Sequence, residues 1–114
     1  MHCSSTLNIN TEEAFLKFVS KNRAVLFYFS TMSCAVGENL EPKVKNLLTI
    51  NFPKIKFFTI DINFSKKIAA KHSAFVEPTI LVFFEGKETI RRSRNISVME
   101  LENAINRPYK LIFE

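Results

Sequence analysis

The sequence predicts an α/β domain in which helices cover a mixed sheet of roughly four strands. Three short apolar runs, 24–29, 55–62 and 79–84, are rich in β-branched and aromatic residues and indicate strands. Segments with helical spacing separate these runs, and a glycine turn follows the third. The expected order is therefore α-β-α-β-α-β-β-α, with parallel crossovers in the first part and a hairpin in the second.

The composition is that of one globular domain. The chain has 114 residues and a mass of 13.2 kDa, with 46% hydrophobic and 24% charged residues. We expect a single domain over 1–114, with 1–10 and 108–114 as peripheral tails. No apolar run reaches the ~20 residues of a membrane-spanning helix, and the first ten residues do not read as a secretory signal. The expected location is the cytoplasm, with no membrane partner.

The first half of the chain contains two helices around a strand. Asn10 and Thr11 are candidate capping residues for a helix over about 11–21, because acidic residues follow them and apolar residues share one face. The run 24–29 is apolar at every position, as expected of a strand buried on both sides. A second helix begins after Cys34 and ends near Thr49, and Pro42 predicts a kink in it.

The second half contains two short helices and a hairpin. After the strand 55–62, a short helix closes near His72. The strand 79–84 turns through Gly86, which supplies the positive φ that hairpins often need, and returns over 88–92. Ser97 and Glu100 form a capping box, and the last helix is expected to stop at Pro108.

Charge and ligand-forming residues exclude several classes of function. The net charge of +5 is mild, and most of the phenylalanines occupy core positions rather than alternating with the basic cluster Arg91, Arg92 and Arg94. We therefore expect no nucleic-acid partner. Two cysteines and two histidines provide too few ligands for a zinc finger, so we expect no metal and no organic cofactor, and His72 is expected at the surface.

Three segments together resemble the thioredoxin family. They are the strand that leads into Cys34 and the Pro42 helix, the strand 57–61 ending in an acidic residue, and 76–86, which runs from Val-Glu-Pro-Thr to a Phe-x-x-Gly turn. The spacings match over about 11–107. The resemblance implies a thioredoxin-like three-layer fold with a mixed sheet of about four to five strands. It also implies that Pro78 is cis and faces the active-site cysteine.

The active-site motif agrees with this family only in part. The family's Trp-Cys-Gly-Pro-Cys corresponds here to Ser33 through Gly37. The nucleophilic cysteine is present as Cys34, whereas Gly37 replaces the second, resolving cysteine. Tyr28 stands in the place of the family's buried aspartate, and Phe57 in that of the lysine that often accompanies it. The resemblance therefore implies a Cys-x-x-Gly member of the family.

A single cysteine at the start of a helix suits nucleophilic attack on a disulfide. The helix dipole and the free backbone N–H groups stabilise its thiolate, which is the reactive species. Because Gly37 has no thiol, the second half of the exchange needs glutathione or another external thiol, or Cys3 if the amino terminus reaches the site. The expected activity is monothiol thiol–disulfide exchange through Cys34 on a protein or glutathione disulfide.

The resemblance also implies a substrate groove, in which a backbone group at residue 76 binds an extended peptide. The candidate substrate-binding residues are Ser33, Gly37, Val76, Glu77, Pro78 and Arg94. Glu77 would raise the pKa of the Cys34 thiol and Arg94 would offset it, and the sequence leaves open which prevails. The alternative function is a non-catalytic thioredoxin-fold module that holds a protein partner on the same surface.

Overall fold

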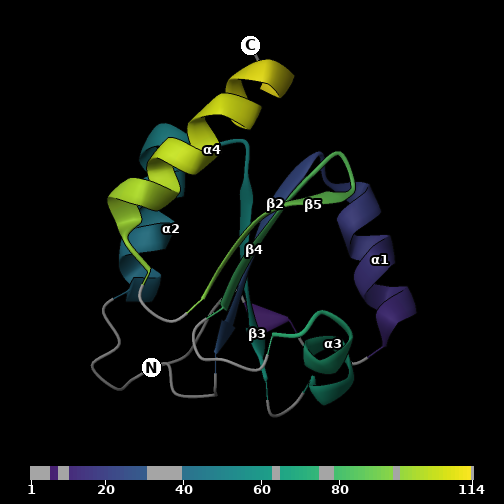
Figure 1. The fold of residues 1–114 in the computed structure, drawn as a ribbon. Coiled ribbons are helices and arrows are strands. Elements are labelled where there is room, and N and C mark those ends of the chain that lie inside the picture. Colours follow the sequence, from purple (N-terminus) through teal and green to yellow (C-terminus); the bar gives the residue numbers. More distant parts are fainter. Residues whose placement is uncertain are drawn as a thin grey trace.

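The computed structural model describes residues 6–7, 11–30, 40–62, 65–74, 79–93 and 96–113. The described helices are α1 (Glu12–Lys21), α2 (Leu40–Asn51), α3 (Lys66–Lys71) and α4 (Val98–Phe113), and the described strands are β1 (Thr6–Leu7), β2 (Ala24–Ser30), β3 (Lys56–Asp61), β4 (Thr79–Phe84) and β5 (Lys87–Ser93). Figure 1 shows three layers, with α2 and α4 on one side of the sheet and α1 and α3 on the other. The predicted three-layer α/β fold is confirmed.

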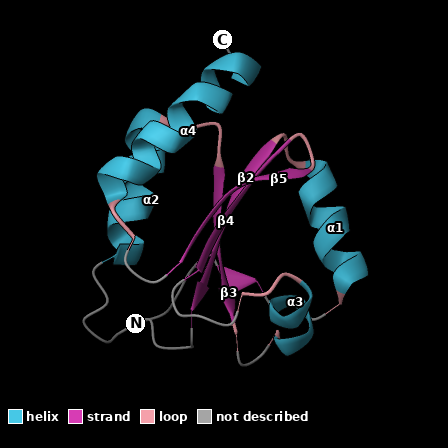
Figure 2. Ribbon diagram, in the orientation of Figure 1, coloured by secondary structure: helices cyan, strands magenta, loops and turns pink. Residues whose placement is uncertain are grey.

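The described strands form one mixed sheet in the order β1-β3-β2-β4-β5. Figure 2 shows the strands, in magenta, between the helices of the two sides. The β2 strand is parallel to β3 and antiparallel to β4, and β4 and β5 form the antiparallel hairpin. The parallel crossovers in the first part and the hairpin in the second are therefore as predicted. The two-residue strand β1, parallel to β3, was not predicted, and it places part of the expected amino-terminal tail in the sheet.

The core consists of two layers that share β2. Along this strand Leu26 and Tyr28 face α2 and α4, whereas Phe27 and Phe29 face α1 and α3, and all four are fully buried. On the second side, the ring of Phe15 lies 4.7 Å from that of Phe27. Burial on both faces explains why the sequence of β2 is apolar throughout rather than alternating.

The capping signals before α1 and α4 and the signal for the hairpin turn were read correctly, with one exception. The backbone N–H of Ala14 donates to the Thr11 hydroxyl, which caps α1 as predicted. The hairpin turn has positive φ at Gly86 (82°), as expected, and also at Glu85 (54°). Ser97 accepts from the N–H of Glu100 at 3.2 Å. The exception is the other half of that capping box, because the Glu100 carboxylate binds Arg92 instead.

The prediction that the last helix stops at Pro108 was wrong. The helix α4 continues through Pro108 to Phe113, and Tyr109 is a core residue rather than part of a peripheral tail. A proline inside a helix removes one backbone hydrogen bond and crowds the preceding turn, at a cost of about 3 kcal/mol. The apolar residues beyond it offset this cost, since Ile112 and Phe113 pack on the same core layer. Pro42 lies in the first described turn of α2, and the kink expected there stays a prediction.

Candidate functional site

The residues predicted to form the site lie outside the described part of the chain. They are Ser33, Cys34 and Gly37 between β2 and α2, Val76, Glu77 and Pro78 before β4, and Arg94 after β5. Cys3, the alternative resolving thiol, lies outside it as well. The described residues on either side of these segments define where each of them is attached to the fold.

The described residues that border these segments lie together at one end of the strands. The backbone N–H of Ile62 donates to the carbonyl of Ser30, the last residue of β2, at 2.9 Å. In the next row, Phe29 pairs with Thr79, the first residue of β4, and Thr79 pairs with Ser93, the last residue of β5. The segments 31–39, 75–78 and 94–95 are therefore all joined to the same end of neighbouring strands.

An aromatic pair lies close to this end of the strands, inside the fold. Tyr28 is fully buried, and its ring lies 6.3 Å from that of Phe57 on β3. The two strands run side by side, with Phe57 registered against Leu26, two residues before Tyr28. The two positions that the resemblance equates with an aspartate and a lysine of the family are therefore neighbours here, and aromatic side chains occupy both. Neither side chain carries a carboxylate or an amine.

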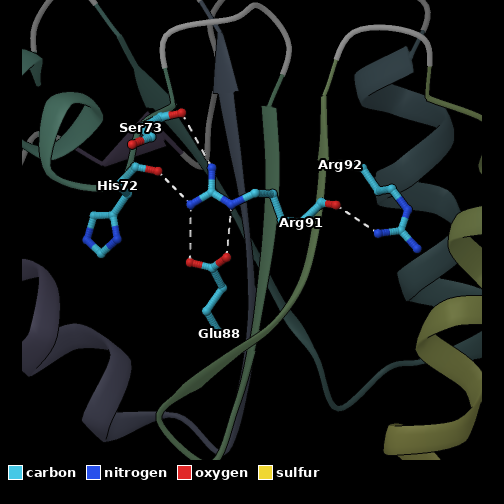
Figure 3. Close-up of polar contacts among 5 residues, drawn as sticks. All are labelled: His72, Ser73, Glu88, Arg91 and Arg92. Atoms are coloured by element: carbon cyan, nitrogen blue, oxygen red, sulfur yellow. Dashed lines mark hydrogen bonds and ion pairs between the residues drawn. The ribbon is translucent and has the colours of Figure 1, made fainter.

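A cluster centred on Arg91 joins β5 to the turn that follows α3 (Figure 3). The guanidinium donates to the carbonyl oxygens of His72 at 2.6 Å and Ser73 at 3.4 Å, and it binds both carboxylate oxygens of Glu88, at 3.0 and 3.3 Å. Ser73 has a φ of 54°, in the left-handed region. The described chain continues only to residue 74 beyond this turn, so the cluster lies immediately before 75–78.

An irregularity in the hairpin brings Glu88 and Arg91 together. Residues three apart on a regular strand point to opposite faces. Here the pairing passes from Val82 with Ile90 to Phe83 with Glu88, so β5 contains one extra residue at this bulge. Glu88 and Arg91 therefore share the face that carries α1 and α3. No local pattern in the sequence predicts this, because the bulge depends on the register of the whole hairpin.

Arg92 points to the opposite face and binds α4. Its guanidinium forms two hydrogen bonds of 2.8 Å to the carboxylate of Glu100. These hydrogen bonds lower the pKa of Glu100 and raise that of Arg92. Arg91 and Arg92, which looked in sequence like part of one basic cluster, thus lie on opposite sides of the strand (Figure 3). Each is paired with a glutamate, and Arg92 also donates to the carbonyl of Arg91 at 2.8 Å.

The expectation that His72 is a surface residue was wrong. Only 14% of its side chain is exposed, and its ring lies 4.5 Å from that of Phe15. Its Nε2 atom lies 3.1 Å from a carboxylate oxygen of Glu12, at the start of α1. Sixty residues separate these partners in the chain, so their contact could not be predicted from spacing. The pair fixes the turn after α3 against α1.

The described residues contain no group of three or more histidine, cysteine, aspartate or glutamate side chains placed to hold a metal ion. None of the helices in the described ranges has the length and apolar character needed to cross a membrane. A shallow surface pocket, about 400 Å³ in volume, is lined by Lys21, Arg23, Lys54 and Lys56. It lies where β2 and β3 begin, at the end of the sheet opposite the candidate site.

Comparison with known proteins gives a consistent result. A family model described as thioredoxin matches residues 6–107. The thioredoxin-like protein YdfQ of Bacillus subtilis is 29% identical over 94 residues, which are 82% of this chain and 83% of that protein.

Solved structures agree in fold. Mitochondrial thioredoxin 3 of Saccharomyces cerevisiae, in its oxidised form, is similar with a TM-score of 0.74 at 20% identity, over 90% of this chain and 92% of that one. A thioredoxin of Fasciola hepatica is similar with a TM-score of 0.71 at 26% identity, over 94% and 98% of the two chains.

Proposed function

Because the chain belongs to the thioredoxin family, we propose that it carries out thiol–disulfide exchange through a single reactive thiol, that of Cys34. The family match covers Cys34 and Pro78 together. The substrates we propose are protein or glutathione disulfides. A reducing compartment such as the cytosol supplies the external thiol that this chemistry needs.

The observation that carries the proposal is the arrangement of strand ends. The row formed by Phe29, Thr79 and Ser93 places the starting points of three separate segments on adjacent strands. Adjacent strands lie about 4.8 Å apart. Residue 78 directly precedes Thr79, on the strand next to β2, and residue 94 directly follows Ser93, one strand further away. We propose that both approach the thiol on the segment that leaves Ser30. This arrangement supports a shared site of Cys34, Pro78 and Arg94.

The proposed reaction has three steps. The Cys34 thiolate attacks one sulfur of the substrate disulfide, a new S–S bond forms, and the other substrate sulfur leaves as a thiolate that takes up a proton. A glutathione or protein thiolate then attacks the Cys34 sulfur, forms a new mixed disulfide with it and releases the substrate's second thiol. In the third step a second external thiolate attacks the external sulfur of this mixed disulfide, the two external thiols become one disulfide, and Cys34 leaves as the thiolate. The substrate disulfide gains the two electrons that the two external thiols lose. Gly37 cannot take part in the second step, since it has no side-chain sulfur.

A second candidate function is a non-catalytic module that binds a protein partner on the same surface. The observation that favours it is the aromatic pair Tyr28–Phe57, which replaces the acidic and basic residues of the family below the site. A protein that only binds needs no buried proton acceptor. In this case Ser33, Val76 and Glu77 would contact the partner, and Cys34 would serve as a small side chain.

Turnover assays separate the two candidates. In a Cys3→Ser background, Cys34 is the only cysteine of the chain. We expect this variant to form a mixed disulfide with glutathione disulfide, detected by mass spectrometry, and to reduce a protein disulfide only when glutathione is added. The Gly37→Cys variant should gain measurable reduction without glutathione, when a reductase recharges its two cysteines.

The matched control is Cys3→Ser with Cys34→Ser, which must lose all exchange. Failure of the Cys3→Ser protein to form any mixed disulfide contradicts the monothiol proposal and favours the binding module. Reduction by the unmodified chain without added thiol, lost in Cys3→Ser, would instead identify Cys3 as the resolving thiol.

A further inference from the structure

We propose that a basic groove at the end of the sheet opposite the candidate site binds an acidic, extended segment of a protein partner. The basic groove consists of the pocket of about 400 Å³ where β2 and β3 begin and a second pocket of about 280 Å³ beside it, and both are lined by Lys21, Asn22 and Arg23. In Figure 1 it lies at the upper end of the sheet, where α1 and α4 end. Binding there does not depend on the exchange chemistry, because no residue of the groove belongs to the candidate site.

Four basic side chains from different parts of the fold line the larger pocket. Lys21 ends α1, Arg23 precedes β2, Lys54 lies between α2 and β3, and Lys56 begins β3. No acidic residue lines this pocket among those that the structure describes. Within the same described ranges, no carboxylate lies within ion-pair distance of the three lysines. The groove therefore carries positive charge that attracts carboxylates.

The wall of the groove combines this charge with an apolar surface. The guanidinium of Arg23 pairs with Glu85 of the second pocket at 2.9 Å and donates to the carbonyl of Ile112 at 3.4 Å. It also lies 5.1 Å from the centre of the Phe113 ring, and the Nζ atom of Lys54 lies 5.5 Å from the same centre. Phe113 thus lies between two cations, so an occupant of the groove meets charged and apolar contacts together.

The helix dipoles account for only part of the charge. Lys21 lies in the last turn of α1, and Arg23 binds a carbonyl of the last turn of α4, so both also stabilise helix ends. Lys56 belongs to a strand, and the helix ends give no reason for its charge.

The same helix ends argue against a phosphate as the occupant. Both α1 and α4 end at the groove, so the carbonyl groups of these helices lie nearest to it. Phosphate sites in proteins typically use the N–H groups of a helix amino terminus or of a glycine-rich loop. Carboxylates that pair with individual lysine side chains need no such backbone N–H groups.

The groove has the length that an extended peptide needs. It crosses the ends of three adjacent strands, from Lys56 at the start of β3, past Ala24 at the start of β2, to Glu85 directly after β4. Adjacent strands lie about 4.8 Å apart, so this path measures about 10 Å. An extended chain covers that distance in about three residues. Carboxylates spaced along such a chain can pair with separate cations, which one compact anion cannot do.

The test is an NMR titration of the isotope-labelled protein with a peptide of sequence Glu-Glu-Leu-Glu-Glu-Leu, blocked at both ends. The ionic strength is about 0.15 M, at which exposed charges more than about 8 Å apart are largely screened. The peptide contains no cysteine, so its binding does not involve the thiols. We expect shifts of backbone amides at 20–24, 54–56 and 85–86. The same peptide with glutamine in place of glutamate should bind about tenfold more weakly, because its ion pairs are lost.

Two matched double variants test the residues themselves. Lys54→Gln with Lys56→Gln removes two cations of the groove and should weaken peptide binding about five- to tenfold, as expected for two ion pairs between exposed groups. Lys43→Gln with Lys45→Gln makes the same change of net charge, with the same spacing, at exposed positions of α2. This control should leave the affinity within about twofold, because distant charges are screened. Lys21→Gln, on a different element, should weaken binding about two- to threefold.

Equal affinities in the two double variants would overturn the proposal, as would amide shifts outside the groove or no binding of the peptide by the parent protein. A lower Kd for inorganic phosphate than for the peptide, at the same amides, would identify a phosphate site instead. Glu114, which follows Phe113, lies outside the described residues. If only the Glu114→Gln variant bound the peptide, the occupant of the groove would be this carboxylate of the chain itself, and the proposal of a protein partner would be wrong.

Discussion

Replacing Tyr109 by alanine tests whether the end of α4 belongs to the core. Tyr109 lies beyond Pro108, yet only 7% of it is exposed. Its ring is 4.9 Å from that of Phe52 and 4.8 Å from that of Phe113, and its hydroxyl accepts from the N–H of Lys54 at 3.3 Å. The substitution removes these contacts and leaves a space between α4 and the segment that follows α2.

Truncation of a buried aromatic residue to alanine costs about 3–5 kcal/mol. We expect a value near the lower end, about 3 kcal/mol, because Tyr109 is one turn from the end of a helix that can partly close the space. For a domain of this size that corresponds to a fall in Tm of roughly 10 °C. Tyr109→Phe keeps the ring and loses only a long hydrogen bond, which should cost about 1 kcal/mol.

The assay is urea denaturation at equilibrium, read as the free energy of unfolding, with Leu111→Ala as the control. Leu111 is on the same helix, two residues further on, and is 80% exposed, so its removal should cost less than about 0.5 kcal/mol. If Tyr109→Ala and Leu111→Ala are equally stable, then residues beyond Pro108 do not pack on the core, and the account of α4 is refuted.

Two further predictions concern single residues elsewhere in the fold. Gly86→Ala should lower the free energy of unfolding by about 1–2 kcal/mol. A Cβ at this position meets no atom within 4 Å, so the cost comes only from the φ of 82°. An unchanged urea midpoint would contradict this prediction and show that the turn changes its conformation to fit alanine. The hydrogen bond from Arg92 lowers the pKa of Glu100 in the folded state. The stabilisation that this pair gives to the fold is therefore complete above the unfolded-state pKa of about 4.3, and it is lost as the pH falls through the folded-state pKa. The difference in urea midpoint between the parent protein and Glu100→Gln should therefore be present at pH 7 and shrink in acid, and a difference that grows below about pH 3 would contradict this sign.

The sequence predicts the sheet well because the relevant signals are local. The apolar run of β2 and the positive φ at Gly86 follow from side-chain burial and turn chemistry within a few residues. Pro108 shows the limit of such reasoning, since the local cost of a proline was outweighed by the burial of Tyr109 on a distant part of the chain.

The surroundings of the site were harder to predict because they depend on register and on contacts between distant segments. The bulge in β5 sets which face Arg91 occupies, and the partner of His72 is sixty residues away. Glu100 illustrates competition between local and distant partners. Its position three residues after Ser97 suggests a capping box, but Arg92 on the neighbouring strand takes its carboxylate. The proposal for the residues that carry out the chemistry is based on the sequence motif and on the strand ends that border their segments.

The central claim is that Cys34 is a reactive thiolate at neutral pH, and the pKa of its thiol tests this most directly. In the Cys3→Ser protein the rate of alkylation by iodoacetamide, followed from pH 4 to pH 10, reports that pKa. The account predicts a midpoint clearly below the free-cysteine value of about 8.5. A midpoint at or above that value would contradict thiol–disulfide exchange through Cys34 and favour a protein-binding role for the same surface.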